Sequence, residues 1–227
     1  KTLIHLNYYS DIVHKLPALP PNMKILNISG DYDFVFENLP HSLFQLTIYT
    51  CDEPFLKSKY NRELPSNKLY YFNPGDSYDK DINRSSNSIN RLYLGRGYNG
   101  KDIDISNLKL VQLKIKADCR SLKLGTCLKR LSLTGSYNQK IIFPDSLEEL
   151  ELNGEFDGKL NLENTKLNKL ITGDKFNENF VSLPLSLKRI KFGKNFNQSI
   201  DNLPDQIELV EFVENSNYSK NISKLPI

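Results

Sequence analysis

The sequence predicts an all-β solenoid built from about eleven short repeats, with little helix. The pattern L-x-x-L-x-L, followed by a Gly-containing turn, an aromatic residue and Asn or Asp, recurs along the whole chain. The copies are spaced by about 20 residues, which leaves no room for a full helix in each. Leu-Pro or Phe-Pro precedes several copies at a fixed distance. These observations predict a single solenoid domain over residues 1–227.

The first apolar position of each copy sets the repeat register. These anchor positions are Leu3, Met23, Leu43, Leu69, Ile89, Leu110, Leu128, Leu147, Leu167, Leu187 and Ile207. Because side chains alternate along a strand, the fourth and sixth positions should face inward and the third and fifth outward. We expect the strands to stack in parallel, about 4.8 Å apart, with the aromatic-Asn segments on the return side.

Two copies depart from the pattern. Leu43 and Leu69 are farther apart than other neighbouring anchors, so we expect an insertion around residues 49–64 to loop out. The copy at Leu110 has Cys119 and Arg120 where an aromatic residue and Asn belong. We expect its return segment to be irregular.

The bulk composition restricts the classes of partner. The net charge of +3 is too small to favour nucleic acid or an anionic membrane surface as the partner. No apolar run approaches the roughly 18 residues of a membrane span. Cys51, Cys119 and Cys127 have no metal-ligand spacing, which favours free thiols in an intracellular, cytoplasmic setting, the host cytoplasm for a viral protein. The histidines show no metal-ligand spacing either, and we expect neither a metal nor a cofactor.

Three glycines raise the alternative of a nucleotide-binding loop. Gly95, Gly97 and Gly100 have the G-x-G-x-x-G spacing directly after an apolar run. The residues that follow, KDIDISNL, do not predict the helix that such a loop requires. Gly95 instead occupies the seventh position of its repeat, as Gly75 and Gly193 do in theirs, so we expect the turn to need Gly for its own backbone geometry.

The run SLPLSLKRIKFGKNFNQSIDNLP at 182–204 closely resembles the FNIP repeat, a leucine-rich-repeat variant common in social amoebae and giant DNA viruses. Weaker copies extend the resemblance over the chain. The resemblance implies a leucine-rich-repeat solenoid with a parallel β-sheet on one face and no catalytic residues. It also implies frequent association with an F-box segment that links a target to ubiquitin ligation, although no F-box is visible in this sequence.

The outward positions of the middle repeats suggest a protein-binding face. The candidate residues are Tyr70, Tyr71, Arg91, Tyr93 and Gln112. Tyr and Arg are enriched at interface hot spots. Aromatic cross-strand pairs that only stabilise the sheet are an equal alternative.

Charges alternate in sign along the outward positions of the C-terminal repeats. Glu149 and Glu151 should lie between Arg130 and Lys169. Exposed charges that neutralise one another are the simpler interpretation of this pattern. Glu149 and Glu151 as an acid–base pair would need a pocket and a nucleophile that the sequence does not supply, so no catalytic residue is expected.

An Asn or Asp follows the aromatic residue of most repeats. We expect these residues to form an internal ladder that hydrogen-bonds the backbone of the neighbouring turn. The members are Asp33, Asn61, Asp79, Asn99, Asn138, Asp157, Asn177 and Asn197.

Together these features predict a non-enzymatic protein–protein interaction module with an unknown protein partner and, from the resemblance, a target-recognition adaptor. The alternative is a structural protein that self-associates through its terminal repeats, because an open terminal strand can pair with another chain.

Overall fold

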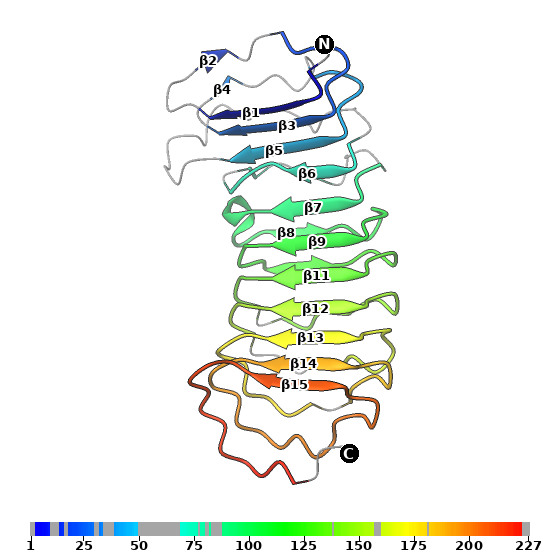
Figure 1. The fold of residues 1–227 in the computed structure, drawn as a ribbon, viewed down its shortest axis with the longest axis vertical. Helices are drawn as coiled ribbons and strands as arrows, with labels where there is room; N and C mark the ends of the chain where they lie inside the picture. The colour runs from blue at the N-terminus through cyan, green and yellow to red at the C-terminus, as the bar shows by residue number, and fades with distance from the viewer. Residues whose placement is uncertain are drawn as a thin grey trace.

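Parallel strands of one sheet run the length of the protein in a computed structural model (Figure 1). The 11-stranded sheet has the order β1-β3-β5-β6-β7-β9-β11-β12-β13-β14-β15. The predicted fold class is therefore confirmed. The strands are β1 (His5–Tyr9), β3 (Ile25–Ser29), β5 (Gln45–Tyr49), β6 (Tyr71–Asn73), β7 (Arg91–Leu94), β9 (Gln112–Ile115), β11 (Arg130–Leu133), β12 (Glu149–Leu152), β13 (Lys169–Thr172), β14 (Arg189–Phe192) and β15 (Leu209–Phe212).

The structure describes residues 3–9, 14–15, 18–29, 32–33, 39–49, 69–76, 78–79, 82, 88–137, 139–156, 160–180 and 182–223. The predicted insertion around 49–64 lies outside these residues, except for Tyr49, which ends β5. Gln45 of β5 is paired with Tyr71 of β6. The sheet is thus continuous although many residues separate these two strands in the sequence.

The strand pairing follows the predicted register. Third-position residues form one continuous column across the sheet, and fifth-position residues form a second on either side of the β6–β7 step, where the paired residues are Tyr71 with Arg91 and Phe72 with Leu92. The first column is His5, Ile25, Gln45, Tyr71, Arg91, Gln112, Arg130, Glu149, Lys169, Arg189 and Leu209. The spacing of the leucines was therefore sufficient to align every strand.

The core lies between the sheet and the return side of the coil. The inward residues Leu26, Phe72 and Leu170 are fully buried at 0% exposure. On the return side Phe176, Phe196 and Tyr218 stack, with ring centroids 6.2 Å apart at both steps. In these repeats the core is thus filled by apolar side chains from the strand and by an aromatic ring from the return segment.

Short strands also form on the return side. β8 (Asp102–Asp104) pairs in parallel with β10 (Ser121–Lys123), and β2 (His14–Lys15) pairs with β4 (Tyr32–Asp33). The expectation of an irregular return segment after Leu110 is therefore wrong. Buried Leu122 alternates with polar neighbours, which is the pattern of a half-buried strand. Cys119 is buried before β10, in the place of the usual aromatic ring.

The G-x-G-x-x-G segment leads into one 3-10 turn, η3 (Arg96–Tyr98), and then into β8. Gly95 has a φ of −88°, which any residue adopts, so the expected reason for this glycine is wrong. A Cβ at Gly95 would lie 2.3 Å from the Cα of Asp76. Gly95 is needed because the stacked turns approach closely, whereas Gly75 has a φ of 86° and does meet a conformational requirement.

Helix is confined to such short turns in the part of the chain that the structure describes. No helix there has the length and apolar character needed to cross a membrane.

Candidate functional site

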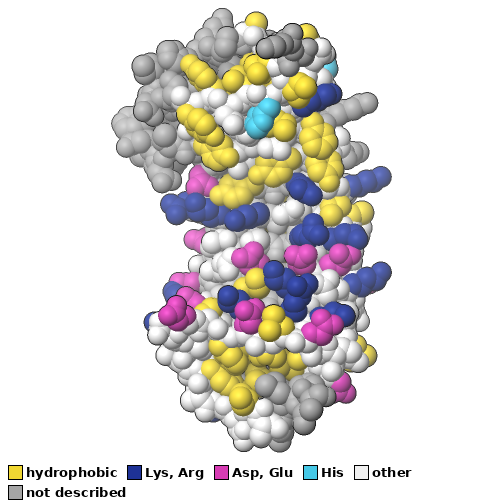
Figure 2. Space-filling model, in the orientation of Figure 1, with side chains coloured by type: hydrophobic (Ala, Val, Ile, Leu, Met, Phe, Trp, Pro, Cys, Tyr) yellow, Lys and Arg dark blue, Asp and Glu magenta, His cyan; other side chains and the backbone are white. Residues whose placement is uncertain are grey.

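An aromatic pair, exposed Phe44 and half-buried Tyr70, and an arginine lie together at the N-terminal edge of the middle strands. The rings of Phe44 and Tyr70 stack with centroids 4.8 Å apart and an angle of 7° between their planes. The Arg91 guanidinium carbon lies 5.6 Å from the centroid of Tyr70. We call Phe44, Tyr70 and Arg91 the aromatic–arginine cluster. Figure 2 shows hydrophobic side chains gathered on this N-terminal half of the sheet face.

The cluster presents both apolar surface and charge to solvent. Phe44 is 47% exposed, and Arg91 is also exposed. Arg91 makes no salt bridge with any acidic residue in the described part of the chain. A guanidinium over an aromatic face keeps its hydrogen-bond donors free for a carboxylate, because the ring occupies only one side of its plane.

The other residues of the predicted face adjoin the cluster. Tyr71 and Gln112 are the register partners of Arg91 on its two sides. Tyr93 lies two residues farther along β7. Tyr71 is half-buried, and this burial raises the pKa of its phenol. Tyr71, Arg91 and Gln112 therefore form one continuous strip across β6, β7 and β9.

Tyr93 has a structural partner of its own. Its hydroxyl donates a hydrogen bond of 2.7 Å to Oδ1 of Asp76, whose Oδ2 lies 3.0 Å from Nζ of Lys116. Burial, together with the bond to Asp76, raises the pKa of Tyr93. Burial alone would raise the pKa of Asp76, but the hydrogen bonds from Tyr93 and Lys116 outweigh it and lower that pKa. This network joins β7 to the turns that follow β6 and β9.

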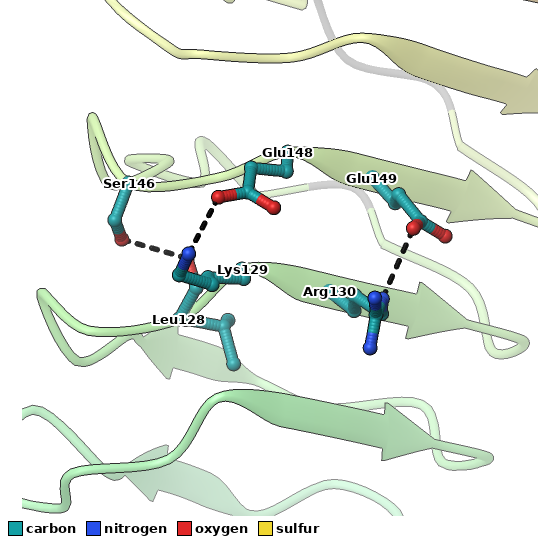
Figure 3. Close-up of polar contacts among 6 residues, drawn as sticks. All are labelled: Leu128, Lys129, Arg130, Ser146, Glu148 and Glu149. Carbon is teal, nitrogen blue, oxygen red and sulfur yellow. Dashed lines mark hydrogen bonds and ion pairs between the residues drawn. The ribbon is translucent and has the colours of Figure 1, made fainter.

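Charged residues of β11 and β12 pair directly, as Figure 3 shows. Lys129 Nζ lies 2.7 Å from Glu148 Oε1, and Arg130 Nε lies 3.0 Å from Glu149 Oε1. The strand register places Glu149 between Arg130 and Lys169, which confirms that prediction. Exposed pairs of this kind each contribute about 0–1 kcal/mol to stability.

A shallow hollow of about 100 Å³ lies over the sheet between β9 and β13. Arg130, Ser132, Glu149, Glu151 and Lys169 contribute to its lining. Ser132 Oγ is buried there and has no hydrogen-bond partner, whereas Glu151 accepts a hydrogen bond of 2.5 Å from Asn153 Nδ2. Ligand pockets commonly measure about 300–1,000 Å³, so this hollow is small for a substrate site.

A second hollow of about 340 Å³ follows the turns after β9 to β13. Its carboxylates are engaged in stacking one turn on the next. Asp118 Oδ1 accepts the backbone N–H of Ser136 at 2.5 Å, and Asp174 Oδ1 accepts that of Lys194 at 3.0 Å. Within the described ranges, no cluster of His, Cys, Asp and Glu has an arrangement that would hold a metal ion.

Cys119 and Tyr137 form a buried pair in the core. Sγ of Cys119 lies 4.0 Å from the Tyr137 hydroxyl oxygen. Burial raises the pKa of Cys119 to about 11 and also raises that of Tyr137. The thiol is therefore protonated near neutral pH, and a protonated thiol is a poor nucleophile.

Several residues of the predicted Asn/Asp ladder accept hydrogen bonds from the next repeat. Asn99 Oδ1 accepts the backbone N–H of Asp118 at 2.9 Å, and Asn177 Oδ1 accepts that of Asn197 at 2.7 Å. Asn197 Oδ1 accepts the N–H of Ser219 at 3.0 Å.

The ladder lies at the surface, so the expectation that it is internal is wrong. Asn99 and Asn177 are exposed and Asn197 is half-buried. Asp79 differs in chemistry, since its Oδ2 lies 3.4 Å from Lys101 Nζ. The remaining predicted members fall outside the residues or side chains that the structure describes: Asp33, Asn61, Asn138 and Asp157.

A serine ladder was missed by the sequence reasoning. Serines directly before the anchors donate to a backbone carbonyl of the preceding repeat. The pairs are Ser42 to Met23 (2.6 Å), Ser88 to Leu69 (3.1 Å), Ser146 to Leu128 (2.7 Å) and Ser186 to Leu167 (2.8 Å). The recurring Ser directly before the anchor Leu or Ile was the available signal, and each accepting carbonyl belongs to the preceding anchor residue.

Comparison with known proteins agrees with this architecture. No curated protein matches the sequence. A solved structure described as CroV588, a novel circular LRR protein, from a giant virus, is similar with a TM-score of 0.55 and 19% identity. The similarity covers 99% of this chain and 45% of that one, so this chain spans less than half of its length. Residues 176–215 match the FNIP repeat family. The chain therefore has the fold of a leucine-rich-repeat solenoid, and its residues 176–215 are similar to FNIP repeats.

Proposed function

We propose that the chain is a non-enzymatic protein-interaction module that binds a protein partner through the aromatic–arginine cluster and the adjoining Tyr71 and Gln112. The observation that carries this proposal is the stack of exposed Phe44 on half-buried Tyr70, beneath an exposed arginine without a carboxylate partner in the described residues. Aromatic rings and arginine are the side chains that most often dominate binding energy at interfaces.

The chemistry of the cluster indicates the kind of contact. A partner loop with an apolar or aromatic side chain would cover the Phe44 ring, and a carboxylate beside it would pair with Arg91. The strip across β6, β7 and β9 extends this contact along the sheet. In this proposal the chain is a target-recognition adaptor, a role that the resemblance to FNIP repeats supports.

The absence of catalysis is part of the proposal. The hollow over Glu149 and Glu151 is small, and one of these carboxylates is paired with Arg130. The pKa of Cys119 is raised in the core, which opposes a nucleophilic role. A sheet with outward side chains on successive rungs instead suits recognition of an extended protein surface.

The test compares two double variants in affinity capture from the cytoplasm of the native or host cell. One variant carries Phe44→Ala and Arg91→Ala. The matched control carries Ile142→Ala and Arg120→Ala, which also remove one exposed apolar side chain and one exposed arginine. A captured protein is then purified and titrated against each folded variant.

We expect the dissociation constant to rise by about tenfold or more for the cluster variant and to stay unchanged for the control. Equal affinity for both variants would exclude the aromatic–arginine cluster as the binding surface.

A second candidate function is assembly through the outermost strands. β1 has the exposed apolar residues Tyr8 and Tyr9, and Leu209 of β15 is 44% exposed. Stacking of β15 on β1 of another copy would continue the parallel sheet and cover these side chains. Species that grow beyond a dimer with rising concentration in sedimentation would support it, and a constant monomer mass would contradict it.

A further inference from the structure

The C-terminal half of the sheet face carries bands of alternating charge. We define a rung as one strand together with the residue before it. Figure 2 shows the basic and acidic side chains in successive bands across this part of the molecule. The rungs are basic at β11 (Lys129, Arg130), acidic at β12 (Glu148, Glu149, Glu151), basic at β13 (Lys169) and β14 (Lys188, Arg189, Lys191), and acidic at β15 (Glu208, Glu211).

Internal pairing leaves several of these charges available. The described residues form salt bridges between Lys129 and Glu148 and between Lys188 and Glu208 at the edge of the sheet. On the face itself, Arg130 and Glu149 form the one salt bridge found among the described residues of these rungs. The described residues give Arg189, Lys191 and Glu211 no salt-bridge partner, and the buried hydroxyl of Ser132 lacks a hydrogen bond.

The banding is complementary to itself. A second copy lies face to face with the first when it is rotated by 180° about an axis that runs parallel to β13, just above the sheet face. This rotation keeps each position along the strand but reverses the order of the rungs, so β12 faces β14 and β11 faces β15. The residues that then face each other are Glu149 and Arg189, Glu151 and Lys191, Glu148 and Lys188, Lys129 and Glu208, Ser132 and Glu211, and Arg130 and the apolar Leu209.

We propose that this face binds a second copy of the chain in a twofold dimer centred on β13. The facing strands of the two copies run in the same direction, whereas their solenoid axes run in opposite directions. Each carboxylate of β12 meets a cation of β14 at the same position along the strand. At the centre, the half-buried Ile171 side chains of the two copies meet. Sheets packed face to face lie about 10 Å apart, a distance that opposed Glu and Arg or Lys side chains can bridge.

The choice of β13 as the centre of the dimer follows from the signs of the charges on the rungs. An axis along β12 would bring the basic rungs β11 and β13 together. An axis between β13 and β14 would oppose the acidic rungs β12 and β15. Among axes with at least two charged rungs on each side, only the axis along β13 matches acidic with basic rungs throughout, at the cost of bringing the two Lys169 side chains near each other.

The geometry also sets the strength of the dimer. Five rungs about 4.8 Å apart and strands of about five residues give a footprint on the order of 300–400 Å² per copy. Stable complexes bury about 800 Å² per partner, so the dimer is weak and depends on ionic strength. It is a separate property from partner binding at the aromatic–arginine cluster.

The test is sedimentation velocity at high micromolar protein, in low and in high salt, with two charge-reversal variants. Variant A carries Glu149→Lys and Glu151→Lys, and variant B carries Arg189→Glu and Lys191→Glu. Each variant alone opposes like charges, whereas A mixed with B opposes unlike charges at both ends of the interface. Circular dichroism verifies that each variant is folded. The control carries Asp145→Lys and Glu163→Lys, which change the net charge as variant A does but at exposed positions outside the sheet.

We expect a monomer–dimer equilibrium for the unmodified chain that weakens in high salt. The dimer dissociation constant should rise by at least about tenfold in A and in B alone, and return toward the original value when A and B are mixed. The control should behave as the unmodified chain. A monomer at all concentrations in low salt, or a mixture that stays monomeric, would overturn the proposal. Dimers unaffected by the reversals would overturn it too, as would species larger than dimers, which would indicate end-to-end stacking.

Discussion

Replacing Leu150 by Ala tests the inward face of the sheet and the repeat register together. Leu150 is 1% exposed and packs between its register partners Leu131 and Leu170 on the two neighbouring strands. The change removes three carbons, worth about 2.4 kcal/mol at roughly 0.8 kcal/mol per buried methylene. Backbone hydrogen bonds hold both neighbouring strands in place, so the cavity cannot collapse fully. We expect a total loss of about 3–4 kcal/mol in the free energy of unfolding.

The assay is equilibrium unfolding in urea followed by circular dichroism, with Glu151→Ala as the control. Glu151 is the next residue of the same strand but faces outward, where it accepts a surface hydrogen bond from Asn153 Nδ2. Its removal should change the free energy of unfolding by about 0.5 kcal/mol or less. Equal losses for the two variants, at similar denaturant slopes, would refute the assignment of inward and outward positions.

Three further outcomes follow from the structure. Gly193→Ala should reduce the free energy of unfolding by about 1–3 kcal/mol and so lower the melting temperature. The reason is that the added Cβ would lie 2.2 Å from a backbone oxygen of the preceding repeat. Folding lowers the pKa of Asp76 below its ordinary value of 3.8. The ionised carboxylate therefore stabilises the fold when the pH is above 3.8, and this stabilisation is lost as the pH falls through the lower pKa of the folded state. The stability difference between wild type and Asp76→Asn in urea melts should therefore be largest near neutral pH and shrink in acid. A thiol reagent at neutral pH should label exposed Cys127 and spare Cys119, as mass spectrometry of the labelled protein would show.

The fold was accessible from the sequence because its stabilising pattern is local and repeated. Each L-x-x-L-x-L run specifies which side chains point inward, and a slip of one residue would expose all of them. Leu-Pro dipeptides and aromatic residues mark the turns and return segments at constant spacing. The strand pair β8 and β10 escaped prediction because Cys119 replaced the aromatic marker, although the alternation around Leu122 was present.

The candidate site was only partly accessible from the sequence. The register alone placed Tyr71, Arg91 and Gln112 in one strip. The stacking of Phe44 on Tyr70 depends on the side-chain conformations at the strand edge, which the repeat pattern does not specify.

The sequence by itself determined the solenoid, the order of its strands and the charges on each rung, because period-two alternation and a constant repeat length act residue by residue. Only the tertiary structure decided which charges pair within the chain and which remain free, since pairing depends on distances between rotamers on neighbouring rungs. It also showed that Gly95 is required by a neighbouring backbone and not by its own dihedral angles. Contacts of this kind join repeats that are about 20 residues apart, and no local pattern in the sequence contains them.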